Sequence, residues 1–253
     1  MRVGVVGGGA MGSWLRREFS SVHEVAVFDV DRSRSDVGSL GELVEWAEVV
    51  VVAVPFWEVA GVLKSLAPLS SGRLVMDIAT FKEGVAEAYR LFPPDALVAS
   101  VHPLFGPGAP SIRGQRVLVM EVPGRRGAAE AFRFWAALGA RVEWGDLERH
   151  DFYVSRTIAL SYAVGLALAR VYAELGEEVF RYGGTSFRYL ATFAFSLLRD
   201  ANALRYAEKA PLEEFVEALR RGDAPRPLRD PDAAYRAFYE ALRAIEAVGD
   251  IFK

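Results

Sequence analysis

The sequence predicts an α/β fold, a doubly wound parallel sheet, followed by an all-α domain. Three observations support this prediction. A glycine-rich turn at residues 7–12 separates an apolar run from a helical stretch. Short apolar runs then alternate with helical patterns as far as Asp146. From His150 onward, apolar residues recur only at helical spacing.

The predicted strands are short runs rich in β-branched residues. Residues 49–54 read V-V-V-V-A-V, which is typical of a strand covered on both faces of a parallel sheet. Helical or crossover segments separate the strands, as βαβ units require. The strands are expected at residues 1–6, 24–28, 49–54, 74–78, 97–101, 117–121 and 141–144.

The helical half is predicted as a separate domain. We expect a first domain at residues 1–148 and a second at residues 149–253. Helices are expected at 152–175, 185–198, 212–219 and 233–248. The stretch 157–169 is apolar almost all round, so it must be buried on several sides. It is either the central helix of this domain or the core of a homodimer in which helices of two copies interleave, and we expect the dimer.

Composition excludes several classes of function. The 253 residues carry a net charge of −3, which gives no reason to expect a nucleic-acid partner. With no cysteine and three histidines, disulfides, thiolate catalysis and a metal site are not expected. No apolar run approaches the ~20 residues that cross a bilayer, and the N-terminus does not resemble a signal peptide. We therefore expect a cytoplasmic protein that does not bind membranes.

The glycine-rich turn predicts a dinucleotide site. It reads G-x-G-x-x-G between a strand and a helix, the arrangement of a Rossmann-type domain. Gly7 allows the sharp turn, Gly9 lets a pyrophosphate approach the backbone, and Gly12 lets the helix pack on the strand. The N–H groups at the helix start then face the phosphates. The expected contacts are Gly7, Gly9, Ala10, Met11 and Gly12.

An acidic residue at the end of the second strand favours NAD. The Asp29 carboxylate can accept both ribose hydroxyls of an adenosine. Arg32 follows closely and could reach a 2′-phosphate, so NADP stays open. Val54 and Pro55, at the end of the third strand, are suited to pack against the cofactor.

His102 is the candidate catalytic base. It follows a strand directly, where ligands bind in an open parallel sheet, and its imidazole can exchange a proton near neutral pH. A histidine beside a nicotinamide can take a hydroxyl proton as hydride leaves the carbon. The alternative is a capping or core histidine. His150 and Asp151 open the helical region as a helix start, a hinge contact or a catalytic pair, and His23 is expected at the surface.

The stretch 182–188 is a candidate anion site. Gly183 and Gly184 precede a helix that starts with Thr and Ser, which leaves N–H groups for an anion. Arg188 in the first turn could grip a carboxylate bidentately, or it is a solvated helix residue.

These motifs together resemble the prephenate dehydrogenase family. The resemblance rests on the glycine loop, D-x-A-T-x-K at 77–82, H-P-L-F-G-P at 102–107, the His-Asp pair at 150–151 and G-G-x-x-F-R at 183–188. It covers nearly the whole chain. It implies NAD- or NADP-dependent oxidative decarboxylation of prephenate to 4-hydroxyphenylpyruvate, or of arogenate to tyrosine, in tyrosine biosynthesis.

The resemblance also implies roles for single residues. His102 would hydrogen-bond the ring hydroxyl and help remove its proton, with Thr80 orienting both and Lys82 near the nicotinamide end of the cofactor. Arg188 would bind a substrate carboxylate, beside Gly184. Many family members carry a second histidine where this chain has Tyr162, so Tyr162 is expected to face the substrate and to influence the choice between keto acid and amino acid.

Two alternatives remain at this point. One is another small-substrate dehydrogenase, of the β-hydroxyacid dehydrogenase or pyrroline-carboxylate reductase type. These lack the H-P-L-F-G-P block, and the β-hydroxyacid enzymes place a key lysine in the helical domain, where this chain offers only Lys209 before the C-terminal Lys253. The other is a non-catalytic NAD-binding regulator, which would bind dinucleotide without turnover.

Overall fold

The chain forms two compact units. The computed structural model describes residues 1–222, 226 and 229–247. The first unit is Met1–Asp151 and the second is Phe152–Lys253. The division lies after Asp151 rather than after residue 148, so His150 and Asp151 belong to the α/β unit.

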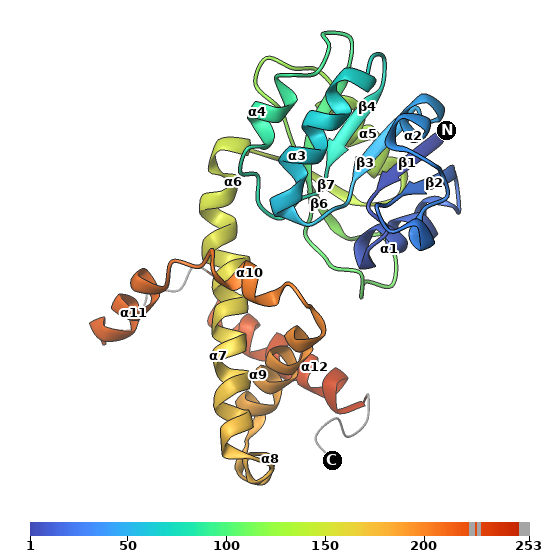
Figure 1. The fold of residues 1–253 in the computed structure, drawn as a ribbon. Helices are drawn as coiled ribbons and strands as arrows, with labels where there is room; N and C mark the ends of the chain where they lie inside the picture. Colours follow the sequence, from blue (N-terminus) through green and yellow to red (C-terminus); the bar gives the residue numbers. More distant parts are fainter. Residues whose placement is uncertain (223–225, 227–228, 248–253) are drawn as a thin grey trace. The chain divides into compact units, whose positions relative to one another are not determined.

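The first unit contains the predicted α/β sheet. Its order is β2-β1-β3-β4-β5-β6-β7, and every neighbouring pair except β5 and β6 runs parallel (Figure 1). The doubly wound Rossmann-type fold is confirmed. The strands are β1 (Arg2–Val6), β2 (Glu24–Phe28), β3 (Val49–Val52), β4 (Leu74–Asp77), β5 (Leu97–Pro103), β6 (Arg116–Met120) and β7 (Arg141–Gly145).

The sheet is mixed rather than fully parallel. β5 and β6 pair antiparallel, with His102 opposite Leu118. Residues 104–115, which connect them, form no helix. A parallel pair usually needs a crossover helix, and this connection has none, so the chain returns antiparallel. β5 is therefore hydrogen-bonded on both sides, to β4 and to β6, which fixes the backbone that carries His102.

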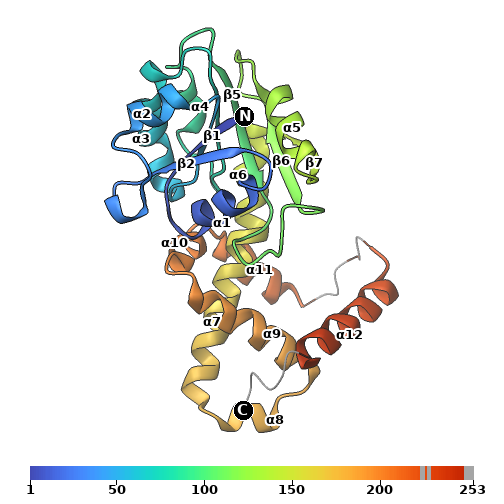
Figure 2. The ribbon, with the colours of Figure 1, turned by 90° about the vertical axis from the view of Figure 1, so that its right-hand side faces the viewer.

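Helices cover both faces of this sheet. Phe19 of α1 packs edge-on against Trp135 of α5 at 5.8 Å between ring centroids, so these helices share one face. On the other face, α2 approaches so closely that a Cβ on Gly4 would lie 2.9 Å from Leu43. Figure 2 shows α2, α3 and α4 together on one side of the sheet. The helices are α1 (Ala10–Phe19), α2 (Leu40–Trp46), α3 (Phe56–Leu66), α4 (Val85–Tyr89), α5 (Ala128–Ala137) and α6 (Leu147–Val154).

The loop after β5 is tied to α1. The indole N–H of Trp14 donates to the Ala109 carbonyl at 2.9 Å, and the Trp14 ring lies 5.3 Å from that of Phe105. The Glu18 carboxylate accepts from the Ile112 N–H at 2.9 Å. The segment that follows His102 is thus anchored to the helix that follows the glycine turn.

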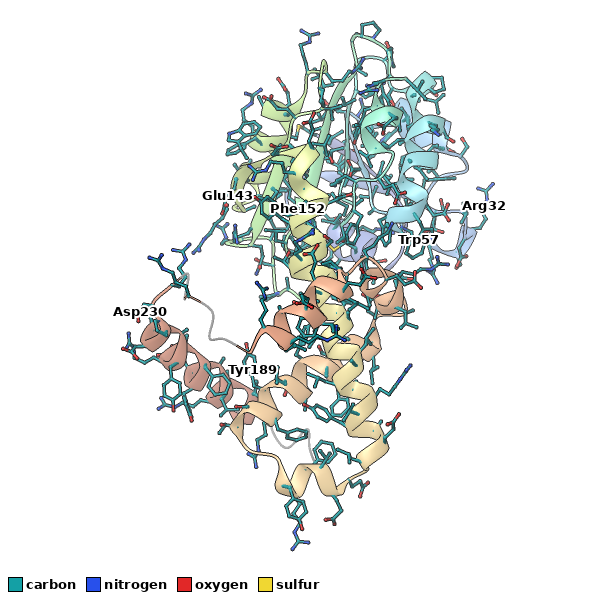
Figure 3. All side chains as sticks on the ribbon, turned by 90° about the vertical axis from the view of Figure 1, so that its left-hand side faces the viewer. Arg32, Trp57, Glu143, Phe152, Tyr189 and Asp230 are labelled. Carbon is teal, nitrogen blue, oxygen red and sulfur yellow. The ribbon has the colours of Figure 1, made fainter. Side chains whose placement is uncertain are left out.

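The second unit is helical, as predicted. α9 and α10 pack against α7, and the Tyr189 ring of α9 lies 5.3 Å from Phe238 of α12 (Figure 3). The short helices α8 and α10 have no clear apolar period and were not expected. The end of the helix expected at 233–248 lies outside the described residues. The helices are α7 (Leu160–Leu175), α8 (Glu178–Tyr182), α9 (Thr185–Ser196), α10 (Ala203–Ala207), α11 (Leu212–Arg221) and α12 (Pro231–Ala247).

One continuous helix is longer and more apolar than expected. α6 runs through a π-helical turn, Ser155–Ala159, into α7, so a helix extends over Leu147–Leu175. By length and composition alone it could cross a membrane, which contradicts the expectation from the sequence. The core helix of a water-soluble protein meets the same criterion. Only 17% of its most apolar window is buried.

Candidate active site

The glycine turn has the geometry of a phosphate cradle. Gly7 has φ +104°, and a Cβ there would lie 2.7 Å from the Ala53 carbonyl oxygen. A Cβ on Gly12 would lie 1.8 Å from the Gly7 carbonyl oxygen, so both positions require glycine. A Cβ on Gly9 would meet nothing within 4 Å, which leaves room for a ligand. α1 begins at Ala10, and no side chain caps its first N–H groups.

Asp29 lies beside this cradle. Its carboxylate accepts from the Gly8 N–H at 2.5 Å and from the Asp31 N–H at 2.8 Å. Arg32 is exposed and extends away from the sheet (Figure 3). The other expected contacts line the same carboxyl edge: Ala10 and Met11 in the first turn of α1, Val54 half-buried after β3, and Pro55 exposed at the start of α3.

His102 belongs to a buried polar cluster. It lies within β5 and is 3% exposed. Its Nδ1 is 2.9 Å from Nε2 of His150, whose Nδ1 is 2.7 Å from the Asp151 carboxylate. His102 Nε2 makes no hydrogen bond with any described residue, so it is the nitrogen available to a ligand.

Lys82 lies near His102. Its ammonium donates to the Asp77 carboxylate at 2.5 Å and to the Val101 carbonyl at 2.7 Å. Burial lowers the pKa of Lys82, while the neighbouring Asp77 carboxylate opposes that shift. The Tyr89 hydroxyl donates to the Ala99 carbonyl and accepts from the Asp77 N–H. The ion pair is therefore enclosed by hydrogen bonds, as buried charge requires.

Electrostatics keep His102 neutral near pH 7. Burial, the Lys82 ammonium and His150 all hold the pKa of His102 well below its ordinary value of 6.5. An unprotonated imidazole is the form that can accept a proton. The cluster therefore supplies a base that is ready at neutral pH.

This protonation equilibrium predicts how stability depends on pH. Because the folded pKa of His102 is lowered, the unfolded chain binds a proton that the folded chain rejects as pH falls below 6.5. The free energy of unfolding should therefore decline from about pH 6.5 downward. Urea unfolding of wild type and His102→Asn from about pH 8 to about pH 5 measures this. Equal declines in both proteins would contradict the assignment to His102.

The site contains two residues whose role the sequence left open. His150 and Asp151 were open between a helix start, a hinge and a catalytic pair, and their contacts place them behind His102. The cap supplied by Asp146, whose carboxylate accepts from the Glu148 and Arg149 N–H groups, fixes the start of α6. The His-Asp pair directly after this cap was the available signal.

The contacts of Thr80 with the described residues indicate no role for it. It is half-buried in the loop between β4 and Lys82, and its hydroxyl makes no hydrogen bond with a described residue. Its role beside the substrate hydroxyl stays a prediction.

The predicted carboxylate-binding residues belong to the second unit. Arg188 is exposed in the first turn of α9, and its N–H donates to the Gly184 carbonyl at 3.1 Å. Tyr162 is half-buried on α7, and its hydroxyl donates to Asp200 at 3.4 Å. Burial and the Asp200 carboxylate raise the pKa of Tyr162 to about 12. Their role in substrate binding stays a prediction.

The fold and the cradle define a class of protein. A glycine turn leading into a helix N-terminus, an acid after β2 and a mostly parallel sheet are the features of a Rossmann-type nucleotide-binding domain. A second, helical unit follows it in the chain.

A comparison with known protein families matches part of the chain. Residues 23–143 match the model of the prephenate dehydrogenase nucleotide-binding domain. This match covers just under half of the chain and agrees with the resemblance inferred from the motifs.

Relatives extend this similarity over the chain. A Methanocaldococcus jannaschii protein named as a probable arogenate/prephenate dehydrogenase is 24% identical over 196 residues, which are 71% of this chain and 44% of that protein. The chain thus spans less than half the length of that relative.

Solved structures share the fold. A Corynebacterium glutamicum protein described as a putative prephenate dehydrogenase has a TM-score of 0.71 at 18% identity, with 97% of this chain and 96% of that one covered. The prephenate dehydrogenase of A. aeolicus, solved with hydroxyphenyl propionate and NAD+, has a TM-score of 0.64 at 20% identity, with 98% and 96% covered.

Proposed function

We propose that this protein is a cytoplasmic dehydrogenase that oxidises prephenate to 4-hydroxyphenylpyruvate and CO2, or arogenate to tyrosine and CO2, with NAD as the preferred acceptor. One observation carries the proposal. The buried, neutral His102 has its Nε2 available near the carboxyl end of β5. The parallel strands β1, β3 and β4 end on the same side of the sheet, and the glycine cradle follows β1. The family match and the names of the relatives support the choice of substrate.

The residues present fit a dinucleotide. Gly9 leaves open space in front of the α1 N-terminus, and Asp29 offers a carboxylate where an adenosine ribose would lie. The bound dinucleotide would supply the hydride acceptor. His102 would accept the substrate hydroxyl proton at Nε2 while C4 of the ring becomes a carbonyl. Loss of CO2 then makes the ring aromatic, and the phenolic oxygen recovers the proton.

Turnover tests the proposal directly. Prephenate and arogenate are supplied separately, each with NAD and with NADP, and reduced nicotinamide is followed by absorbance. We expect turnover with at least one substrate, faster with NAD. Dinucleotide binding without turnover of either substrate contradicts the proposal and points first to another dehydrogenase, and then to a non-catalytic regulator.

Asp29→Ala should weaken NAD binding more than NADP binding. The carboxylate recognises ribose hydroxyls, which NADP lacks at the 2′ position, so its loss removes an interaction specific to NAD. Titration of both dinucleotides into wild type and variant measures the two dissociation constants. Arg32→Ala is the matched control and should weaken NADP selectively. Equal weakening of both dinucleotides by Asp29→Ala would rule out the ribose contact.

Arg188→Ala should raise the KM for prephenate with little change in dinucleotide affinity. The guanidinium is proposed to bind a substrate carboxylate, and charge-assisted hydrogen bonds of this kind contribute about 1.5–3 kcal/mol. Steady-state kinetics measure the change, with Arg181→Ala, in the preceding short helix, as the control. An unchanged KM would remove Arg188 from the substrate site.

The second unit is proposed to hold a homodimer together. The helix Leu147–Leu175 leaves most of its apolar window uncovered. Val171 and Leu175 are 50% and 62% exposed. A second copy of this helix would bury such a face, since contiguous exposed apolar surface marks an interface. Sedimentation of the purified protein without detergent should give a dimer mass, whereas a monomer would contradict the proposal.

A further inference from the structure

His102, His150 and Asp151 form one hydrogen-bonded chain. His102 Nδ1 lies 2.9 Å from His150 Nε2, and His150 Nδ1 lies 2.7 Å from the Asp151 carboxylate. The two imidazoles are 3% and 4% exposed, so bulk water does not compete for the contact between them, whereas the Asp151 side chain is 38% exposed. The direction of the hydrogen bonds along the chain decides which nitrogen of His102 carries a proton.

Asp151 sets that direction. Both its carboxylate oxygens accept from the backbone N–H of Lys82, at 3.0 and 2.9 Å. An ionised carboxylate can only accept, so Nδ1 of His150 must donate to it. When His150 carries this one proton only, its Nε2 is an acceptor, and Nδ1 of His102 donates to it. The remaining nitrogen, Nε2 of His102, therefore carries a lone pair.

We propose that His150 and Asp151 form a proton relay behind His102, which fixes His102 in its proton-accepting tautomer and holds the substrate proton during the reaction. The arrangement of the three side chains is independent of the substrate. Only the source of the proton, a substrate hydroxyl, rests on the proposed function.

The proton steps balance as follows for prephenate. The C4–H electron pair would leave as hydride to the oxidised dinucleotide of the proposed function. The O–H pair becomes the second bond of the carbonyl, and the proton moves to His102 Nε2. The Nδ1 proton of His102 moves to His150 Nε2. When the bond between the ring and its carboxylate breaks, that electron pair enters the ring and releases CO2. The phenolate oxygen then takes a proton from His102 Nε2, and His150 returns its proton to His102 Nδ1.

The surrounding charges favour this transfer. A proton held on His102 would face burial and the ammonium of Lys82, the same causes that lower the pKa of His102. Asp77 is already paired with that ammonium at 2.5 Å. A proton held on His150 instead lies against the Asp151 carboxylate. The positive charge therefore moves from a site beside a cation to a site beside an anion.

The tautomers can be measured without substrate. Long-range 15N–1H spectra of histidine-labelled protein at about pH 7.5 distinguish Nδ1–H from Nε2–H imidazoles. We expect His102 and His150 both as the Nδ1–H form, with His23, in the turn before β2, as internal reference. The signals are assigned with His23→Gln and His102→Asn variants. An Nε2–H form at His102 in the wild type would overturn the proposal.

Asp151→Asn should reverse the direction of the hydrogen bonds that link residue 151, His150 and His102. The amide oxygen can still accept from Lys82, but the amide nitrogen can donate to His150 Nδ1 and force Nε2–H forms on both histidines. We expect kcat to fall by ~10²–10⁴-fold with dinucleotide affinity unchanged, and raising the pH should not restore it. Asp146→Asn is the matched control, because asparagine caps the same helix equally well. Wild-type kcat in Asp151→Asn would overturn the proposal.

His150→Gln separates two roles of His150: fixing the tautomer of His102 and accepting a proton from it. The amide oxygen can accept from His102 Nδ1 and keep the tautomer, but it cannot take up a proton. We expect the Nδ1–H signal of His102 to remain while kcat falls by at least ~10²-fold. A retained tautomer with wild-type kcat would limit His150 to orientation and overturn the relay. Absence of turnover in the wild type would contradict the proposed substrates, but not the tautomer result.

Discussion

Replacement of His102 by asparagine should lower kcat by ~10²–10⁴-fold, the usual contribution of a general base. The asparagine amide keeps a polar group in the buried site, but it cannot accept the substrate proton as the imidazole Nε2 does. Because His102 lies far along the sheet from the cradle around Gly9, dinucleotide affinity should be unchanged. Stopped-flow kinetics with prephenate and a dinucleotide titration measure the two quantities.

A matched control separates this effect from the loss of any histidine. His23→Asn removes a partly buried histidine that stacks on Phe134, away from the cluster. We expect wild-type kcat in that variant. Wild-type turnover in His102→Asn, with folding and dinucleotide binding intact, would mean that another group takes the proton.

Removing the charge of Asp77 should lower the free energy of unfolding more than any other substitution proposed here. The side chains of Lys82 and Asp77 are 2% and 0% exposed and lie 2.5 Å apart. Asp77→Asn leaves the Lys82 ammonium buried without its counter-ion, and breaking such a pair costs ~3–5 kcal/mol. Urea unfolding at about pH 7 measures the free energy of unfolding. The loss should shrink at high pH, because the pKa of Lys82 is lowered by burial and the amine can then become neutral.

The surface ion pair between Arg116 and Glu143 provides the control. Its side chains are 57% and 51% exposed, so water already solvates both charges. Glu143→Gln should leave unfolding nearly unchanged. The double variant Asp77→Leu/Lys82→Met should recover much of the loss, since replacing a buried pair by apolar groups is often neutral. A small effect of Asp77→Asn would show that water reaches Lys82.

Much of the fold follows from local patterns in the sequence. The all-apolar run at 49–54 could only be a central strand, and the glycine turn required a strand before it and a helix after it. The antiparallel pairing of β6 did not follow in the same way. Nothing in residues 116–120 encodes strand direction, which depends on the missing crossover helix in residues 104–115.

The site was predicted only in part because it depends on long-range contacts. His102 could be placed from its strand end, whereas His150 lies 48 residues away and its contact with His102 depends on where α6 packs. The bond between the Lys82 N–H and Asp151 spans 69 residues and involves a backbone group, which carries no sequence signal. Residue type indicated the chemistry, and only the fold could show which groups are within hydrogen-bonding distance of one another.

The anchored loop after β5 has a consequence for catalytic efficiency. Trp14 and Glu18 of α1 bind the loop that begins just beyond His102, while the N-terminus of the same helix faces the phosphate cradle. The base and the cradle are therefore parts of one rigid framework before any ligand arrives. The entropy of aligning them is lost during folding and not in each catalytic cycle, so preorganisation can contribute to a high effective molarity of the base.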